Sequence, residues 1–201
     1  ADERAGFEIH VAFAVDQANP VGLDDNSFTR LVAEIVPHKR LLATPWPRLT
    51  YREAMERFGK DNPDLRYGME LKDVKDIVAG SGFKVFETVI SQSGDIRGLN
   101  AKGCAEFTRK QIDDLTEYVK AFGAKGLAYI AIPETGELRS TFAKFLAPEL
   151  LQSLMERMDA QPGDLLLFVA DRPAIVFESL ARLRVHLAEQ LQLADPDLLA
   201  F

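Results

Sequence analysis

The chain has 201 residues, of which 47% are hydrophobic and 27% charged, and its formal net charge at pH 7 is -7. That length and hydrophobic content suffice for one sizeable core. The acidic total argues against broad electrostatic binding of nucleic acid, and we expect no DNA partner. A local basic face is still compatible with this net charge.

The sequence also bears on the cellular setting. Cys104 is the single cysteine, which excludes an intrachain disulfide and fits a reducing compartment. No apolar run approaches the roughly 20 residues that a membrane helix needs. The first residues lack the charged head and apolar core of a secretory signal. We therefore expect a cytoplasmic chain with no membrane partner.

The first 48 residues predict short elements. Residues 7–15 alternate large apolar residues with small or polar ones, which is the pattern of a strand. Residues 24–26 offer three capping side chains for a short helix, and Pro37 ends it. The proline-rich stretch 37–48 predicts an extended connector.

A second helix signal follows. Thr50 and Glu53 have the spacing of a capping box, and Gly59 stops the short helix that they begin. Residues 69–71 then suggest a brief strand, and residues 73–78 suggest a helical turn or short helix.

Residues 83–101 predict a pair of strands. Residues 83–90 alternate apolar and polar side chains, so we expect a strand there. Residues 93–95 have hairpin-turn chemistry, and residues 95–101 would return as the partner strand.

Residues 107–132 form the clearest unit, a helix followed by a strand. Thr108 and Gln111 have capping-box spacing, and Gly123 stands where a left-handed residue closes a helix. Residues 127–132 follow as a short buried strand. The helix has one apolar stripe, made of Ile112, Leu115, Val119 and Phe122.

The second half repeats this alternation. Pro148 suits the first turn of a helix over residues 149–158. Residues 165–170 are almost wholly apolar, which predicts a central strand covered on both faces. Asp171 is expected to cap the last helix, with Pro173 in its first turn.

These patterns predict the α+β fold class, a mainly antiparallel sheet covered by helices with flanking helical segments. The expected strands are residues 83–90, 95–101, 127–132 and 165–170, and the expected covering helices are residues 108–122 and 149–158. The expected boundaries are an N-terminal flanking segment 1–72, a central domain 73–172, and a C-terminal segment 173–201.

No motif establishes a reaction. His10, His38 and His186 lie on three different elements, so a metal role is disfavoured against ordinary satisfied or exposed histidines. Cys104 has no histidine near it in sequence, so a small buried thiol is the favoured interpretation over a nucleophile. Residues 80–82 lack the third glycine of a dinucleotide loop. We therefore predict no metal, no cofactor and no catalytic residue for this chain.

Basic side chains gather around the central helix. Acidic residues interleave with them, so a mixed-charge surface and a nucleic-acid contact both remain open. The candidate contact residues, which lie near the start of that helix or just beyond its end, are Arg97, Lys102, Arg109, Lys110 and Lys125. A helix N-terminus adds partial positive charge and free amides that suit a phosphate.

Several of these stretches resemble bacterial-type aspartyl-tRNA synthetase. The similarity is collinear over residues 49–201 and is most specific in the run Gly123-Ala-Lys-Gly-Leu-Ala-Tyr-Ile130. The other stretches that carry it are residues 49–66, 76–86, 108–113, 143–146, 163–171 and 180–195.

In that family, the corresponding region is the insertion between the second and third class II signature motifs, with the GAD domain at its centre. A similar domain occurs in a subunit of the archaeal glutamyl-tRNA amidotransferase. The resemblance implies a parent enzyme that joins aspartate to tRNA with ATP and magnesium. It also implies the remaining synthetase core as a partner. If the domain contacts tRNA, we expect weak contact with the backbone and shape of the acceptor arm and not with its base sequence.

The departures limit what the resemblance implies. The Phe-Arg-x-Glu of the second motif and the glycine-rich third motif are absent, and Asn62 stands where the family usually has lysine. No ATP-binding or catalytic residue is therefore carried over, and we expect the chain alone to be inactive. The alternative is a free-standing tRNA- or protein-binding module that lacks the synthetase catalytic centre.

Overall fold

The computed structural model describes residues 25–200, so the strand predicted at residues 7–15 lies outside the described part. The chain divides into two compact units. The smaller unit comprises the chain up to Arg48, residues 64–66 and the chain from Ala194. The larger comprises residues 49–63 and 67–193.

The described residues of the smaller unit contain one helix and a short parallel strand pair. Helix α1 spans Asp25–Ile35, which confirms the helix predicted there. Strand β1 (Arg40–Leu41) lies within the predicted connector and pairs with β7 (Leu198–Leu199).

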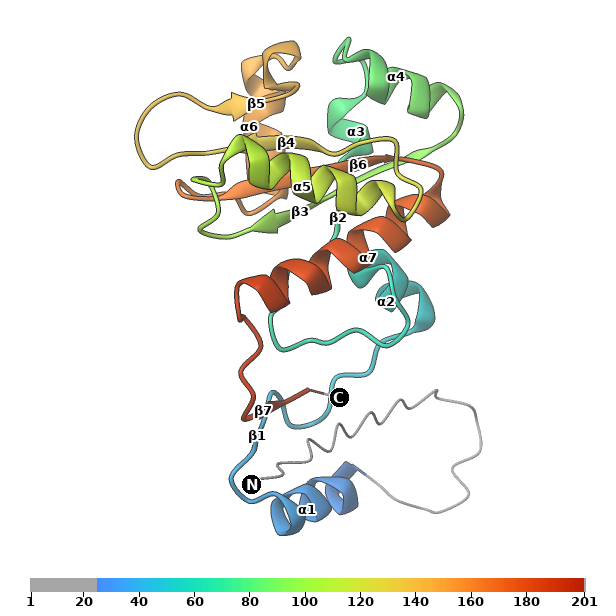
Figure 1. Cartoon of the computed structure of the whole chain (residues 1–201). Helices are drawn as coiled ribbons and strands as arrows, with labels where there is room; N and C mark the ends of the chain where they lie inside the picture. The colour runs from blue at the N-terminus through green and yellow to red at the C-terminus, as the bar shows by residue number, and fades with distance from the viewer. Residues whose placement is uncertain (1–24, 201) are drawn as a thin grey trace. The chain divides into compact units, whose positions relative to one another are not determined.

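The larger unit is built on a five-stranded antiparallel sheet (Figure 1). Three of the four predicted strands are confirmed, and the apolar strand of residues 165–170 lies at the centre, as expected. In spatial order the strands are β2 (Lys72–Asp73), β3 (Asp95–Ala101), β6 (Leu165–Asp171), β4 (Ala128–Ala131) and β5 (Arg139–Ser140).

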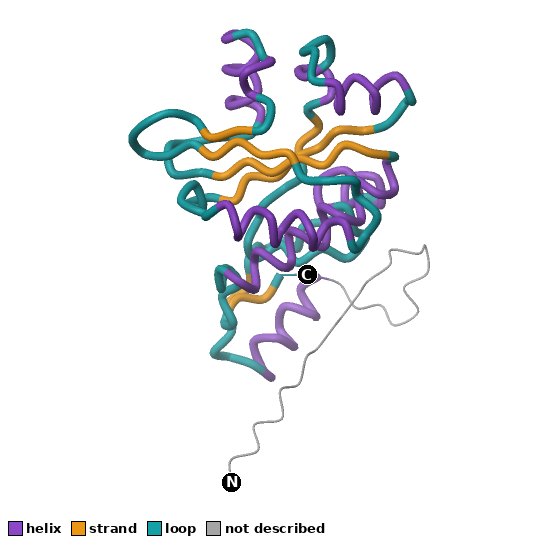
Figure 2. The backbone as a smooth tube through the Cα atoms, turned by 45° about the horizontal axis from the view of Figure 1, so that its top comes forward, coloured by secondary structure: helices purple, strands orange, loops and turns teal. Residues whose placement is uncertain are grey.

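Helices cover both faces of this sheet (Figure 2). On one face lie α5 (Arg109–Lys120) and α7 (Pro173–Gln190). On the other lie α3 (Lys75–Val78), α4 (Lys84–Ser91) and α6 (Pro148–Arg157). The fold is therefore a three-layer α+β arrangement, and the two predicted covering helices lie on opposite faces.

Strand β6 shows why the sheet needs both layers. Leu165, Leu167 and Val169 face α5 and α7, whereas Leu166 and Phe168 face the other layer. All five are fully buried. Alternate residues of a strand point to opposite faces, so a continuous apolar run requires cover on each side.

Helix α2 (Tyr51–Phe58) packs against α7 in the same unit. Its predicted capping box is present, with Thr50 accepting a hydrogen bond from the Glu53 amide. Gly59 ends the helix with a φ of 70°, and a Cβ at that position would lie 2.5 Å from the carbonyl oxygen of Phe177.

The strand predicted at residues 83–90 is wrong, because these residues form helix α4. Phe86 and Val89 are buried at helical spacing, whereas Val85 is 52% exposed. The apolar residues fit both the alternation of a strand and the spacing of a helix. The packing of Phe86 against Phe83 and Phe142 selects the helix. The hairpin is consequently wrong as well, since residues 92–94 join α4 to β3 and Asp95 is the first residue of that strand.

Smaller differences concern element ends. The brief strand predicted at residues 69–71 forms at Lys72–Asp73, and the short helix beyond it is confirmed as α3. Asp171 does not cap α7: it is the last residue of β6, and Arg172 takes the N-cap position without a side-chain cap. Pro173 does occupy the first turn. The irregular stretch after β5 contains the short 3-10 helix η1 (Ala143–Phe145).

No helix within residues 25–200 is long and apolar enough to cross a membrane.

Candidate functional site

The start of α5 carries the predicted capping box. The Thr108 amide donates to Gln111 Oε1 at 2.8 Å, and the Gln111 amide donates to Thr108 Oγ1 at 3.3 Å. The first four amides of a helix have no acceptor within it, and the box uses two of them. The amides of Arg109 and Lys110 therefore remain available to an anion beside their own cationic side chains.

Three of the predicted contact residues belong to the stretch that runs from the end of β3 at Ala101 into the start of α5 at Arg109. We call Lys102, Arg109 and Lys110 the basic corner. The Arg109 side chain is 94% exposed and lies 3.8 Å from Asp113. Lys102 forms an exposed ion pair with Asp159 at 2.9 Å, and this hydrogen bond raises its pKa. Exposed pairs of this kind are weak, so both cations can exchange partners.

The segment leading to the basic corner is held in place by a buried carboxylate. Asp164 is 4% exposed and accepts from the Asn100 side chain at 2.9 Å and the Gly103 amide at 3.1 Å. From the other side, Arg139 donates to the carbonyl oxygens of Ala105 and Phe107. These bonds fix the chain between β3 and α5.

Cys104 lies within this segment and is 2% exposed. Burial, and then the charge of Asp164, raise the pKa of its thiol. A neutral thiol is a poor nucleophile, so Cys104 has the packing role that the sequence favours.

The other two predicted contact residues lie elsewhere. The Arg97 side chain is 13% exposed, donates to Asp95 at 2.8 Å and to the Glu56 carbonyl, and stacks over Phe177. Lys125 follows the opposite end of α5, and a helix of 12 residues is about 18 Å long. The five residues therefore do not form one cluster.

A hollow of about 320 Å³ lies between α5 and α7. We call it the helix-pair pocket, and its lining residues are Gln111, Asp114, Leu115, Tyr118, His186 and Gln190. The rings of Tyr118 and His186 stack with centroids 4.3 Å apart and planes 20° apart. Burial is the main cause that raises the pKa of the Tyr118 hydroxyl, so this phenol is neutral at pH 7.

Sequence reasoning missed this pocket. The four lining residues of α5 have the spacing of one helical face, which was a usable signal. Their partners on α7, however, lie about 70 residues further along the chain, and only the packing of the two helices brings them together.

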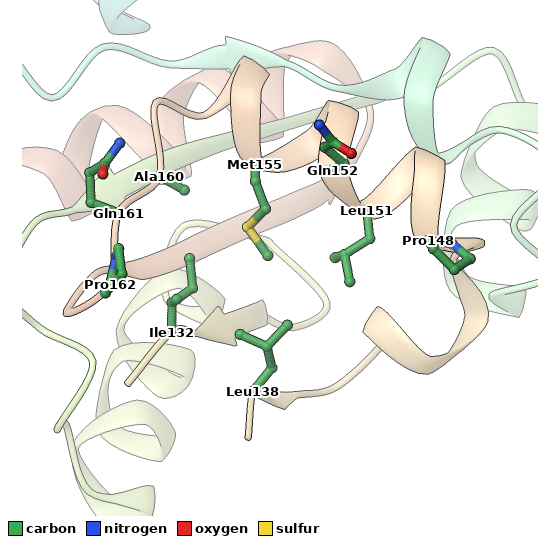
Figure 3. Close-up of a pocket in the computed structure, with 9 residues that line it drawn as sticks. All are labelled: Ile132, Leu138, Pro148, Leu151, Gln152, Met155, Ala160, Gln161 and Pro162. Carbon is green, nitrogen blue, oxygen red and sulfur yellow. The ribbon is translucent and has the colours of Figure 1, made fainter. Parts of the chain in front are cut away.

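A second hollow, of about 360 Å³, lies beside α6 on the other face of the sheet. Figure 3 shows Leu151 and Met155 of α6 pointing toward Ile132 and Leu138. The remaining lining residues are Pro148, Gln152, Ala160, Gln161 and Pro162. None of the nine is charged, so this surface suits an apolar group and not a phosphate.

Within residues 25–200, no group of three or more histidine, cysteine or acidic side chains is arranged to hold a metal ion. His10 lies outside the described residues, and His186 packs in the helix-pair pocket.

The comparison with protein families identifies the class of this fold. Residues 86–180 match the family model described as the GAD domain. That range contains β3 to β6, helices α5 and α6, most of α4 and the first half of α7. The larger unit thus carries a GAD domain.

The curated relatives identify the kind of protein in which the domain occurs. Aspartate–tRNA(Asp/Asn) ligase of Symbiobacterium thermophilum is 54% identical over 76% of this chain, and that of Natranaerobius thermophilus is 47% identical over 95%. The corresponding ligase of Rubrobacter xylanophilus is 49% identical over 99% of the chain. The resemblance to the GAD-containing region of aspartyl-tRNA synthetases is confirmed. The chain spans only 26% to 33% of the length of these three relatives.

Proposed function

We propose that this chain is the non-catalytic insertion region of an aspartyl-tRNA synthetase and that its basic corner contacts tRNA. The identity to ligases over most of the chain, combined with its small share of their length, supports the first part. The parent enzyme would join aspartate to tRNA in the cytoplasm with ATP and magnesium, and the synthetase core would be this region's partner. The exposed cations of the basic corner support the second part.

The expected contact is with phosphates and not with paired bases. An A-form helix hides its major groove, so a surface such as this meets the backbone of the acceptor arm. The amides of the first turn and the side chains of Arg109 and Lys110 offer donors and charge at one place. The net charge of -7 opposes the contact, so the isolated chain should bind weakly.

The experiment is tRNA binding to the chain at low and at physiological salt. Neutralising a few phosphates releases a few counterions, so the logarithm of the affinity should fall with the logarithm of salt with a slope of about -2 to -3. Binding without salt dependence would contradict the proposed contact. No binding at low salt would leave the region as a structural spacer.

The alternative is a free-standing module that binds tRNA or a protein. The uncharged hollow beside α6 favours the protein-binding form of this alternative. The natural gene decides between the two proposals. Continuation past Phe201 into core sequence and a third signature motif supports the synthetase, and a stop codon there supports the free-standing module.

A further inference from the structure

We propose that the helix-pair pocket binds an unpaired nucleobase that carries an exocyclic amino group. The inference rests on the proposed function, since the base would belong to the RNA whose backbone lies on the basic corner. It extends that function from backbone contact to the reading of a base.

Two aromatic side chains line the pocket. Tyr118 and His186 already form a stacked pair, and both side chains are only partly buried. Single-stranded RNA is commonly recognised by bases that leave their own stack and join aromatic side chains. The volume of about 320 Å³ lies at the lower end of the usual range for small-ligand sites.

The polar groups of the pocket suit the edge of such a base. The capping box occupies Gln111 Oε1, which accepts from the amide and the hydroxyl of Thr108. The side-chain NH2 of Gln111 is thereby left as a donor, and the exposed Asp114 carboxylate is an acceptor. Cytosine offers a ring nitrogen to the first and an amino group to the second, whereas uracil offers a carbonyl oxygen where cytosine has the amino group.

The pocket adjoins the basic corner through one helix. Gln111 lines the pocket and directly follows Arg109 and Lys110 in sequence. The Asp114 carboxylate lies in the wall of the pocket, and the charges that act on Tyr118 are those of Arg182 and then Glu189. Asp114 opposes a phosphate at its own position, whereas the exposed side chains of Arg109 and Lys110 favour one at the start of α5, which orients a nucleotide with its base toward Asp114.

The test compares fluorescently labelled hexamers of cytidylate and uridylate in low salt, because these pyrimidines differ at the groups that Asp114 and Gln111 would meet. The intact chain should bind the cytidylate hexamer about tenfold more tightly, since uracil in the same orientation turns its N3–H toward the Gln111 side-chain NH2 and its O4 toward the Asp114 carboxylate. Asp114→Ala should bring the two affinities to within about twofold.

Asp113→Ala is the matched control. It removes the same charge from the neighbouring position of α5, and Asp113 does not line the pocket. This variant should keep the preference for cytidylate. Equal affinity of the intact chain for both hexamers would overturn the inference, and so would an unchanged preference in Asp114→Ala.

Two further measurements distinguish RNA from a free nucleotide as the ligand, and distinguish failure of this inference from failure of the proposed function. Free cytidine 5′-monophosphate should compete at least about tenfold more weakly than the hexamer, because it brings one phosphate to the basic corner. Equal competition would assign the pocket to a free nucleotide and overturn the RNA source. If Arg109→Ala with Lys110→Ala weakens both hexamers while the intact chain shows no preference, the inference fails and the proposed function stands.

Discussion

At the scale of single residues, Arg184 is the side chain whose place the sequence least suggests. It is 2% exposed on α7, and its Nε and Nη2 donate to the Gly68 carbonyl oxygen at 2.9 and 2.7 Å. Its guanidinium also stacks over the rings of Phe58 and Tyr67. Arg184 thus joins α2 and the chain before β2 to α7 within the larger unit.

Replacing this residue tests its structural role. Arg184→Met should lower the free energy of unfolding by about 3 kcal/mol, because the two charge-assisted hydrogen bonds to the Gly68 carbonyl oxygen and the contacts with the rings of Phe58 and Tyr67 are lost. Urea denaturation measures the loss. Arg182→Met is the control on the same helix, where an exposed pair with Glu178 predicts a change below about 0.5 kcal/mol. Equal losses in the two variants would contradict this account of Arg184.

The ion pair of Arg57 and Glu70 predicts a pH dependence. Arg57 donates to Glu70 at 3.0 and 2.6 Å, and these hydrogen bonds lower the pKa of Glu70 from its usual 4.5. A lowered folded-state pKa contributes stability that is present above the unfolded-state pKa and lost as pH falls through the folded-state value. The stability advantage of the native chain over Glu70→Gln should therefore be constant above about pH 5.5 and shrink toward pH 3. Urea titrations at a series of pH values measure it, and an advantage that grows on acidification would refute the assignment.

At the scale of elements, local signals predicted α2 and α5 well. Both predicted capping boxes are present. Each depends on a side chain only three residues after the N-cap, so a local pattern suffices to place the start of the helix. Residues 83–90 show the limit of such signals. Their apolar residues fit period 2 and helical spacing alike, and contacts with Phe142, more than 50 residues away, decide the outcome.

The capping box of α5 gives a prediction at this scale. Thr108→Ala should cost about 1 kcal/mol of stability, because the Gln111 amide loses its acceptor at the helix start. Thermal or urea unfolding measures the change. Thr116→Ala lies within α5, where the hydroxyl bonds only to the Ile112 carbonyl oxygen, and should shift stability by less than about 0.5 kcal/mol. Equal stability of Thr108→Ala and Thr116→Ala would contradict a stabilising contribution from the cap.

At the scale of the whole molecule, the sequence located only part of the candidate site. Lys102 directly follows β3, and Arg109 and Lys110 open α5, so one short connection joins these three residues along the chain. Arg97 was predicted from charge alone, and its burial against Phe177 depends on the packing of α7. The meeting of Tyr118 with His186 likewise requires two helices to be placed side by side.

The absence of the second and third signature motifs predicts an inactive chain. Formation of aspartyl-adenylate needs cations positioned on the phosphates, and no motif of this sequence supplies them. ATP–pyrophosphate exchange with aspartate should therefore stay at the buffer blank. Aspartate-dependent exchange clearly above that blank would show that the sequence has been misinterpreted.

The most direct test of the proposed RNA contact is tRNA affinity in two double variants at low salt. Arg109→Ala with Lys110→Ala removes two charges from the basic corner. Lys84→Ala with Lys144→Ala removes two exposed charges from α4 and η1, on the opposite face of the sheet. Losing about two phosphate contacts should weaken the first variant at least about tenfold and reduce its salt slope by up to about 2, while the second should change affinity by less than about threefold. Equal affinity of the first variant and the intact chain would contradict the account.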